Sequence, residues 1–168
     1  STLYDGLAGS VLSGGFMTDE SKLADYQAGS LEALARKLLL EGGREGFIDA
    51  LLSPHFKQRI DLSVAITRLV PELKRHAAAS NPMSSFLFWN RTRRGVSQIP
   101  LSIMSSIPTV HCPYLDHSVH DFLVGVDPTF FLNNRLHDEV IRRGFPSFSH
   151  VPYEDPGKSA SYQRSDSA

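Results

Sequence analysis

Histidine and cysteine side chains are concentrated in one short stretch of the chain. His111 and Cys112 stand just before Pro113, and His117 and His120 follow three residues apart. At that spacing two histidines share one face of a helix, so imidazole and thiolate ligands would be available to a zinc ion. Paired cysteine spacing is missing, however, and the proline would hold the first two residues away from that face. No metal site is therefore predicted.

Cys112 is also the type of residue that acts as a nucleophile when a neighbouring base removes its proton, and histidines flank it. A small buried cysteine is the alternative, and the more frequent outcome. As the single cysteine it excludes an intrachain disulfide framework and fits a reducing compartment. We therefore expect a cytoplasmic protein.

Glycines recur in the first sixteen residues, STLYDGLAGSVLSGGF. Backbone N–H groups beside glycine can approach a phosphate closely, because glycine has no side chain and tolerates positive φ. The spacing matches neither of the common nucleotide-binding glycine patterns. Tight turns are the favoured interpretation on spacing alone. The glycines concerned are Gly6, Gly9, Gly14 and Gly15.

Three arginines, Arg91, Arg93 and Arg94, follow an aromatic block that ends in Trp89. A guanidinium group binds phosphate or carboxylate through two parallel hydrogen bonds, so this group could hold an anion. A solvated helix end is the alternative, and it is slightly favoured.

Helical periodicity dominates the first half of the chain. Residues 30–40 predict a helix that begins at Ser30, and residues 45–52 predict a shorter one. A longer helix is expected over residues 56–79, where Pro71 should kink or split it. No alternating strand pattern is convincing, so the predicted fold class is mainly α.

In the second half, Asp116 is predicted to cap a helix that begins at His117, and Asn133 or Asn134 to cap another. The side chains expected on the buried face of the first of these helices are Val119, Phe122, Leu123 and Val126, and the apolar residues of the second are Leu136, Val140 and Ile141.

Bulk composition indicates one globular domain. The chain has 168 residues, 41% of them hydrophobic, and a formal net charge of −1. That charge gives no field that favours nucleic acid or an anionic membrane, and no apolar run approaches the ~18 residues that cross a bilayer. We expect a domain over residues 1–150 and a disordered polar tail or linker over 151–168. The beginning lacks a methionine, so we expect a piece of a longer chain, although removal of an initiator methionine would leave the same start.

Two segments together resemble the asparagine synthetase family. The family carries Glu-x-Arg-x-Pro-Phe-Leu-Asp late in its synthetase domain, and Pro113, Tyr114, Leu115 and Asp116 match the end of that motif. Earlier it carries Gly-Glu-Gly-Ser-Asp-Glu-x-x-Gly-Gly-Tyr, which resembles residues 6–16 here. The two motifs occur in the family's order and are separated by helices. The resemblance implies the helical portion of an adenine-nucleotide α-hydrolase-like α/β domain.

The chain also departs from the family. Ser10 and Val11 replace the family's acidic pair, and Thr109 and His111 replace Glu and Arg of the later motif. The Ser-Gly-Gly-x-Asp-Ser loop that grips ATP pyrophosphate is absent, as is the glutamine-hydrolysing domain, and only Lys158 offers a loose match to the catalytic lysine.

The resemblance implies a function and its cofactors. ATP, with magnesium, would activate a side-chain carboxylate, and ammonia would then form the amide; neither cofactor is expected to bind this chain alone. The implied partners are a nucleotide-binding and a glutaminase portion of the same protein, and a homodimer is left open. A non-catalytic helical interaction or scaffold domain is the alternative. The implied cofactor contacts are Gly6, Gly9, Ser10, Gly14, Gly15, Arg94 and Arg142, with Asp116 as a structural cap.

Overall fold

The computed structural model describes residues 2–41, 51, 53–57, 61–99, 102–148 and 151. This part is mainly helical, as the sequence predicts. None of its helices is long and apolar enough to cross a membrane. The elements are β1 (Thr2–Tyr4), α1 (Gly9–Leu12), α2 (Glu20–Gln27), α3 (Leu31–Leu40), α5 (Pro54–Lys57), α6 (Leu62–His76), α7 (Pro82–Leu87), the π-helix η1 (Phe88–Thr92), α8 (Arg93–Gln98), β2 (Thr109–His111), the 3-10 turn η2 (Pro113–Leu115), α9 (His117–Gly125), η3 (Pro128–Asn134), α10 (Arg135–Gly144) and η4 (Pro146–Phe148).

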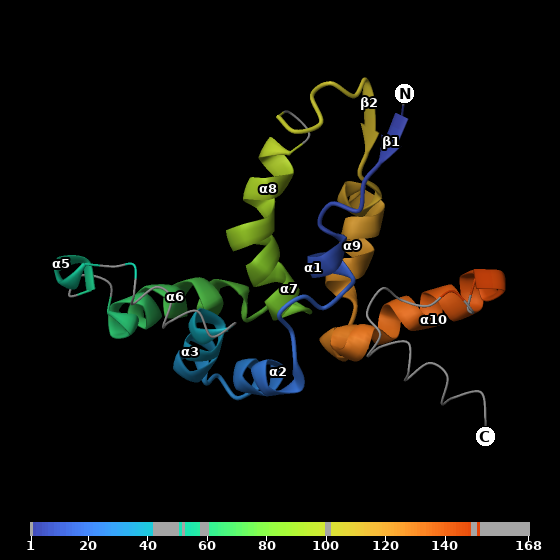
Figure 1. Cartoon of the computed structure of the whole chain (residues 1–168). Helices are drawn as coiled ribbons and strands as arrows, with labels where there is room; N and C mark the ends of the chain where they lie inside the picture. Colours follow the sequence, from blue (N-terminus) through green and yellow to red (C-terminus); the bar gives the residue numbers. More distant parts are fainter. Residues whose placement is uncertain are drawn as a thin grey trace.

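Two apolar clusters hold the helices together, and α1 contributes to both. In Figure 1, α1 lies near the centre, with α2, α3, α6 and α7 on one side and α9 and α10 on the other. Val11 of α1 packs into the first cluster and Leu12 into the second. The other buried members of the first are Leu23, Tyr26, Leu34, Ala35, Ile66, Leu73, Met83, Phe86 and Leu87. Those of the second are Ala8, Leu123 and Phe131.

Helix α6 runs without interruption through Pro71, so the predicted split at this proline is wrong. Ile66 and Leu73 are buried on either side of the proline, where α6 packs against α3. This packing outweighs the backbone hydrogen bond that the proline removes. Residues 58–60 and most of the helix predicted over 45–52 lie outside the described residues, as does the tail from residue 152 onward.

Two short strands were not predicted. β1 and β2 form a parallel pair in which Leu3 lies opposite Val110. Each strand has only three residues, with the middle one half-buried and its neighbours exposed. Such short segments carry too few side chains to show a two-residue period. The fold class mainly α therefore holds, with a small sheet added.

Helix α9 buries less of its apolar surface than predicted. Leu123 is buried, but Val119 is 38% exposed and Phe122 is 65% exposed. The prediction that these two side chains are buried is wrong, because α1 packs against the side of α9 that carries Leu123. On α10, the apolar side chain of Val140 is 51% exposed.

His76, the last residue of α6, joins this helix to α7 and η1. Its Nδ1 lies 2.8 Å from Ser85 Oγ, and its Nε2 lies 3.2 Å from Asn90 Nδ2. An amide nitrogen only donates, so Nε2 accepts and the proton on Nδ1 is donated to the serine. The hydrogen bond from Asn90 therefore needs the neutral ring, because a protonated Nε2 cannot accept. Burial lowers the pKa of His76. The negative charge of Glu72 opposes this shift, and the positive charge of Arg75 adds to it.

We expect acid to destabilise the protein through His76. The unfolded chain takes up a proton near the ordinary pKa of 6.5, whereas the folded ring resists it. The stabilisation is therefore complete above that pH and is lost as the pH falls through the lowered pKa of the folded ring. Thermal melts of the wild type and of His76→Gln measure this effect. The difference in Tm between them should shrink from pH 8 to pH 5, and a constant difference would contradict the prediction.

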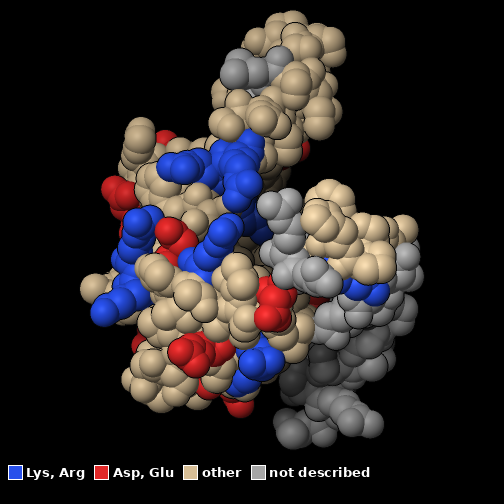
Figure 2. All heavy atoms as spheres, turned by 90° about the vertical axis from the view of Figure 1, so that its left-hand side faces the viewer, with Lys and Arg blue, Asp and Glu red and all other residues tan. Residues whose placement is uncertain are grey.

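Charged side chains are distributed unevenly over the surface. On the face shown in Figure 2, Lys and Arg side chains form a band in the upper half, whereas Asp and Glu side chains are more frequent lower down. The formal net charge of the chain is only −1. The band is therefore a local concentration of positive charge and not an excess over the whole molecule.

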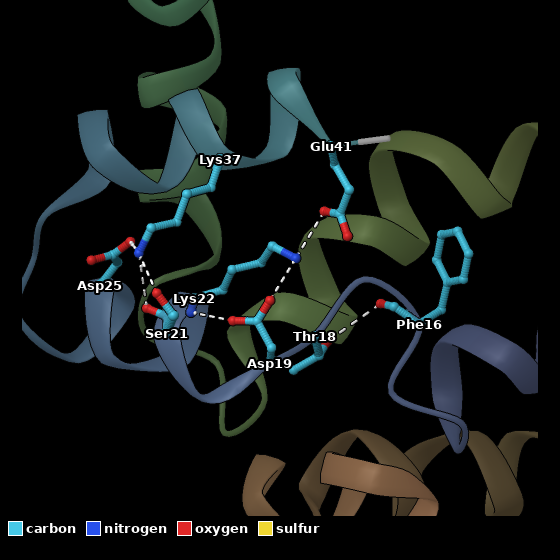
Figure 3. Close-up of polar contacts among 8 residues, drawn as sticks. All are labelled: Phe16, Thr18, Asp19, Ser21, Lys22, Asp25, Lys37 and Glu41. Carbon is cyan, nitrogen blue, oxygen red and sulfur yellow. Dashed lines mark hydrogen bonds and ion pairs between the residues drawn. The ribbon is translucent and has the colours of Figure 1, made fainter. Parts of the chain in front are cut away.

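Lys22 is buried although its side chain is charged. Its Nζ lies 2.8 Å from a carboxylate oxygen of Asp19 and 2.8 Å from one of Glu41 (Figure 3). Burial alone would lower the pKa of Lys22, but hydrogen bonds to the two carboxylates raise it overall. Lys37 pairs with Asp25 beside it. Because a buried charge is costly without its partner, these pairs fix how α3 lies on α2.

Candidate functional site

The two segments that carry the resemblance lie next to each other in space. The glycine-rich loop, residues 6–15, comes after β1, and the segment of residues 113–116 comes after β2. Pairing of the strands continues beyond β1, where the Asp5 N–H donates to the carbonyl oxygen of His111 at 2.9 Å. Since β1 and β2 are parallel, the loop and the later segment both leave the sheet at the same edge (Figure 1).

Gly9 lies directly against the ring of Tyr114. A Cβ atom at this position would come within 2.6 Å of a ring carbon. The residue before it, Ala8, is buried and has φ of 71°, a left-handed conformation that costs energy for any residue other than glycine. Gly6 has open space around it, because a Cβ there would meet nothing within 4 Å.

The end of the loop is shaped by two more glycines. Gly15 has φ of +62°, and a Cβ on it would collide with the carbonyl oxygen of Phe131. At Gly14, a Cβ would lie 3.1 Å from the carbonyl oxygen of Ser10. Close packing therefore explains why glycine stands at three positions of the loop. Contact with a phosphate remains a prediction.

Ser10 and Val11 are the residues that the resemblance aligns with the acidic pair of the asparagine synthetase family. Ser10 is exposed, whereas Val11 is only 1% exposed. The carbonyl oxygen of Val11 accepts a hydrogen bond from Ser84 Oγ at 3.0 Å. Magnesium prefers carboxylate ligands, and neither side chain supplies one. Nor is any group of three or more His, Cys, Asp or Glu placed to hold a metal among the described residues. These residues do not fit a magnesium site.

A contact between Ser13 and His137 was not predicted. Ser13 Oγ donates to the carbonyl oxygen of Gly9 at 3.0 Å and lies 2.7 Å from His137 Nε2. Because the hydroxyl has a single proton, the imidazole must donate to Ser13 Oγ when that proton goes to Gly9. In this arrangement the histidine links α10 to the loop and does not act as a base toward the serine. The two residues are 124 positions apart, and no local pattern indicates their contact.

The structure does not bring Arg94 and Arg142 together. Arg94 lies on α8 and donates to the carbonyl oxygen of Asn90 at 2.7 Å. Arg142 lies on α10 and makes two hydrogen bonds to the carboxylate of Glu139, of 3.3 and 2.8 Å. Figure 1 shows α8 and α10 on opposite sides of α1. The two guanidinium groups cannot contact one small anion together in this arrangement.

The segment of residues 113–116 has a structural role. Pro113 begins the 3-10 turn η2, and Leu115 packs against the second apolar cluster. The carboxylate of Asp116 accepts from the N–H groups of Ser118 at 2.9 Å and of Val119 at 3.3 Å. The predicted cap of α9 is confirmed.

Replacing Asp116 with alanine should lower the free energy of unfolding by about 1 kcal/mol, because two N–H groups at the start of α9 lose their acceptor. Asp116→Asn keeps a side-chain oxygen and should remain close to the wild type. Urea denaturation of the three proteins measures the difference. If the alanine variant is as stable as the asparagine variant, the cap contributes nothing.

Two of the histidines near residue 111 lie against separate aromatic rings. The ring of His111 stacks on Tyr4 with 4.9 Å between centroids, and that of His120 lies 5.1 Å from Phe88. Burial, and then the charge of Asp5, raise the pKa of the Cys112 thiol. A thiol that stays protonated is a poor nucleophile.

No family model matches the chain, and no curated protein or solved structure shows significant similarity to it. The resemblance to the asparagine synthetase family therefore depends on the two motifs alone, and the activity that it implies is a proposal.

Proposed function

We propose that the chain is a C-terminal part of an asparagine-synthetase-like, ATP-dependent amide-forming ligase. The parallel pairing of β1 with β2 is the observation that carries the proposal, because it sets the glycine-rich loop beside residues 113–116. These are the two motifs of the resemblance. In open α/β sheets, ligands bind at the carboxyl ends of parallel strands, which is where both motifs begin.

The conformation of Ala8 supports the same proposal. In the family motif the second glycine falls on this residue, and Ala8 has φ of 71°. A left-handed residue is expected where related chains carry glycine. The loop thus keeps a backbone shape typical of glycine although the side chain has changed.

The small sheet supports a larger α/β domain. Parallel sheets are normally extended by further strands and covered on both faces, yet Thr2, Tyr4, Thr109 and His111 are exposed. Under the proposal, a nucleotide-binding portion of the same protein completes the sheet as an adenine-nucleotide α-hydrolase-like fold, with a glutaminase portion supplying ammonia. The cytoplasm is the proposed location.

In the parent family, a substrate carboxylate attacks the α-phosphorus of ATP and releases pyrophosphate. Ammonia then attacks the acyl-adenylate, and the amide forms as AMP leaves. None of these steps is attributed to a described residue, because Ser10 and Val11 carry no charge. The proposed role of the loop is to form one wall of the cleft. The magnesium ligands and the loop that binds the pyrophosphate of ATP would belong to the nucleotide-binding portion.

A non-catalytic helical interaction domain is the second candidate, and the burial of Val11 favours it. A family carboxylate at this position would have to reach the cleft, but here the side chain points into the first apolar cluster. The loop is also tied to α7 through Ser84. Both features describe a loop used for packing.

Calorimetry with ATP and magnesium tests whether the site of this chain is incomplete. The chain alone should show no measurable binding, and micromolar binding would contradict the view that its site is incomplete. The sequence encoded before Ser1 provides the second test. A Ser-Gly-Gly-x-Asp-Ser loop there supports the ligase, and the longer chain should then release pyrophosphate from ATP when given a carboxylate substrate. If no such loop precedes Ser1, the interaction domain is the better assignment.

A further inference from the structure

An exposed surface of one aromatic and three basic side chains lies at the junction of η1 and α8. We call it the arginine–tryptophan surface, and its residues are Trp89, Arg91, Arg93 and Arg94. All four are exposed, and the tryptophan, the largest of the apolar side chains, is 48% accessible to solvent. The indole therefore offers an apolar surface to solvent directly beside the three positive charges.

The three guanidinium groups are held in place without a carboxylate. That of Arg91 lies 4.5 Å from the centroid of the Phe16 ring, and that of Arg93 lies 5.4 Å from the ring of Trp89. Arg94 donates to a backbone carbonyl, that of Asn90. Within the described part of the chain, no ion pair joins any of the three to Asp or Glu.

Three other arginines of the described chain are paired with glutamate. Arg75 pairs with Glu72 at 2.8 Å, and Arg142 and Arg143 both pair with Glu139. The arginine–tryptophan surface thus keeps three positive charges whose fork-shaped donors still face solvent. Those donors match a carboxylate in charge and in shape.

The backbone beneath this surface is well anchored. One continuous helical segment is formed by α7, η1 and α8. Its beginning is buried in the first apolar cluster through Phe86 and Leu87. Asn90 donates to the carbonyl oxygen of Phe86 and contacts His76. A fixed backbone reduces the entropy that a partner must offset on binding. The wide π-turn at Phe88–Thr92 is also a feature that often marks functional positions.

We infer that the arginine–tryptophan surface binds an acidic segment of a protein partner. Trp and Arg are the side chains most enriched among residues that dominate protein interfaces. The three exposed arginines, which have no carboxylate partner among the described residues, would attract a negatively charged partner locally. Nucleic acid is less favoured, because such binding draws on many phosphate contacts and the formal net charge of the chain is −1. This inference does not depend on the proposed ligase function.

Tryptophan fluorescence tests the inference directly, because Trp89 is the single tryptophan of the chain. The probe is a synthetic peptide of Glu-Glu-Leu repeats, titrated at low ionic strength. We expect a saturable shift of the emission to shorter wavelength, which weakens as salt is added. The triple variant Arg91→Gln, Arg93→Gln, Arg94→Gln should bind the peptide at least about tenfold more weakly.

A second triple variant, Arg135→Gln, Arg142→Gln, Arg143→Gln, removes the same charge from α10 and is the matched control. It should keep the affinity of the wild type to within about twofold. Arg93→Glu provides a further test that changes one exposed side chain, and it should also bind weakly. Circular dichroism checks that every variant is folded.

Three results would overturn the inference. The first is no change in emission with the peptide. The second is equal loss of affinity in both triple variants, which would indicate attraction to total charge. The third is tighter binding of pyrophosphate or of oligothymidylate than of the peptide, which would assign the surface to a small anion or to nucleic acid.

Discussion

The Val11→Glu variant is expected to lose about 4 kcal/mol of its free energy of unfolding, because the new carboxylate would be buried without a partner. The side chain of Val11 is 1% exposed and packs among Leu34, Met83 and other members of the first apolar cluster. Urea denaturation of the wild type and the variant measures the loss.

Ser10→Asp is the matched control for this change. Ser10 is exposed and adjacent in sequence, so a carboxylate there stays in water. The free energy of unfolding should change by no more than about 0.5 kcal/mol. If Val11→Glu is instead as stable as Ser10→Asp, then residue 11 can turn toward solvent. That result would remove the main observation in favour of the interaction domain.

The double variant, Ser10→Asp with Val11→Glu, restores the acidic pair of the family. We expect it to be unstable and to bind no magnesium, because one of its two carboxylates would point into the protein. Calorimetry with magnesium distinguishes this outcome from a restored site. Stable magnesium binding would favour the ligase over the non-catalytic domain.

Substituting alanine for Gly15 is expected to cost about 3 kcal/mol, from two causes. Its φ of +62° is unfavourable for any side chain, and the added Cβ would meet the carbonyl oxygen of Phe131. That carbonyl belongs to a main chain that cannot rotate away as a flexible side chain could. Denaturant unfolding measures the loss.

Gly29→Ala separates these causes. Gly29 has φ of +70°, close to that of Gly15, but a Cβ there would meet nothing within 4 Å. Its substitution should cost about 1 kcal/mol, the conformational part alone. If Gly15→Ala and Gly29→Ala lower the free energy of unfolding equally, the backbone of Phe131 can move away from residue 15, and the predicted clash is wrong.

Local patterns predicted the features that depend on neighbouring residues. The helix that starts after Ser30 and ends at Leu40 follows from leucine spacing within a single segment. The cap at Asp116 follows from a carboxylate just before a helix, and its two hydrogen bonds are present. Each of these depends on residues within one or two turns of each other.

Features made by distant residues could not be predicted in this way. The pairing of β1 with β2 and the hydrogen bond between Ser13 and His137 join segments that no periodicity connects. The burial of Val11 and the exposure of Phe122 depend on which neighbour covers each face. An apolar stripe shows that a face can be buried, but it does not show what lies against it. The glycine-rich loop could therefore be located from sequence, whereas its packing could not.

The two apolar clusters differ in when they can form as the chain leaves the ribosome. Every buried member of the first cluster lies at or before Leu87, so that cluster can assemble while the rest is still being made. Leu12 has to wait for Leu123 and Phe131, and β1 has to wait for β2. Until then, one side of α1 and an edge of β1 are open to other chains. Between synthesis of residues 87 and 131, this side of α1 and the edge of β1 therefore stay open to mispairing even when the first cluster has formed.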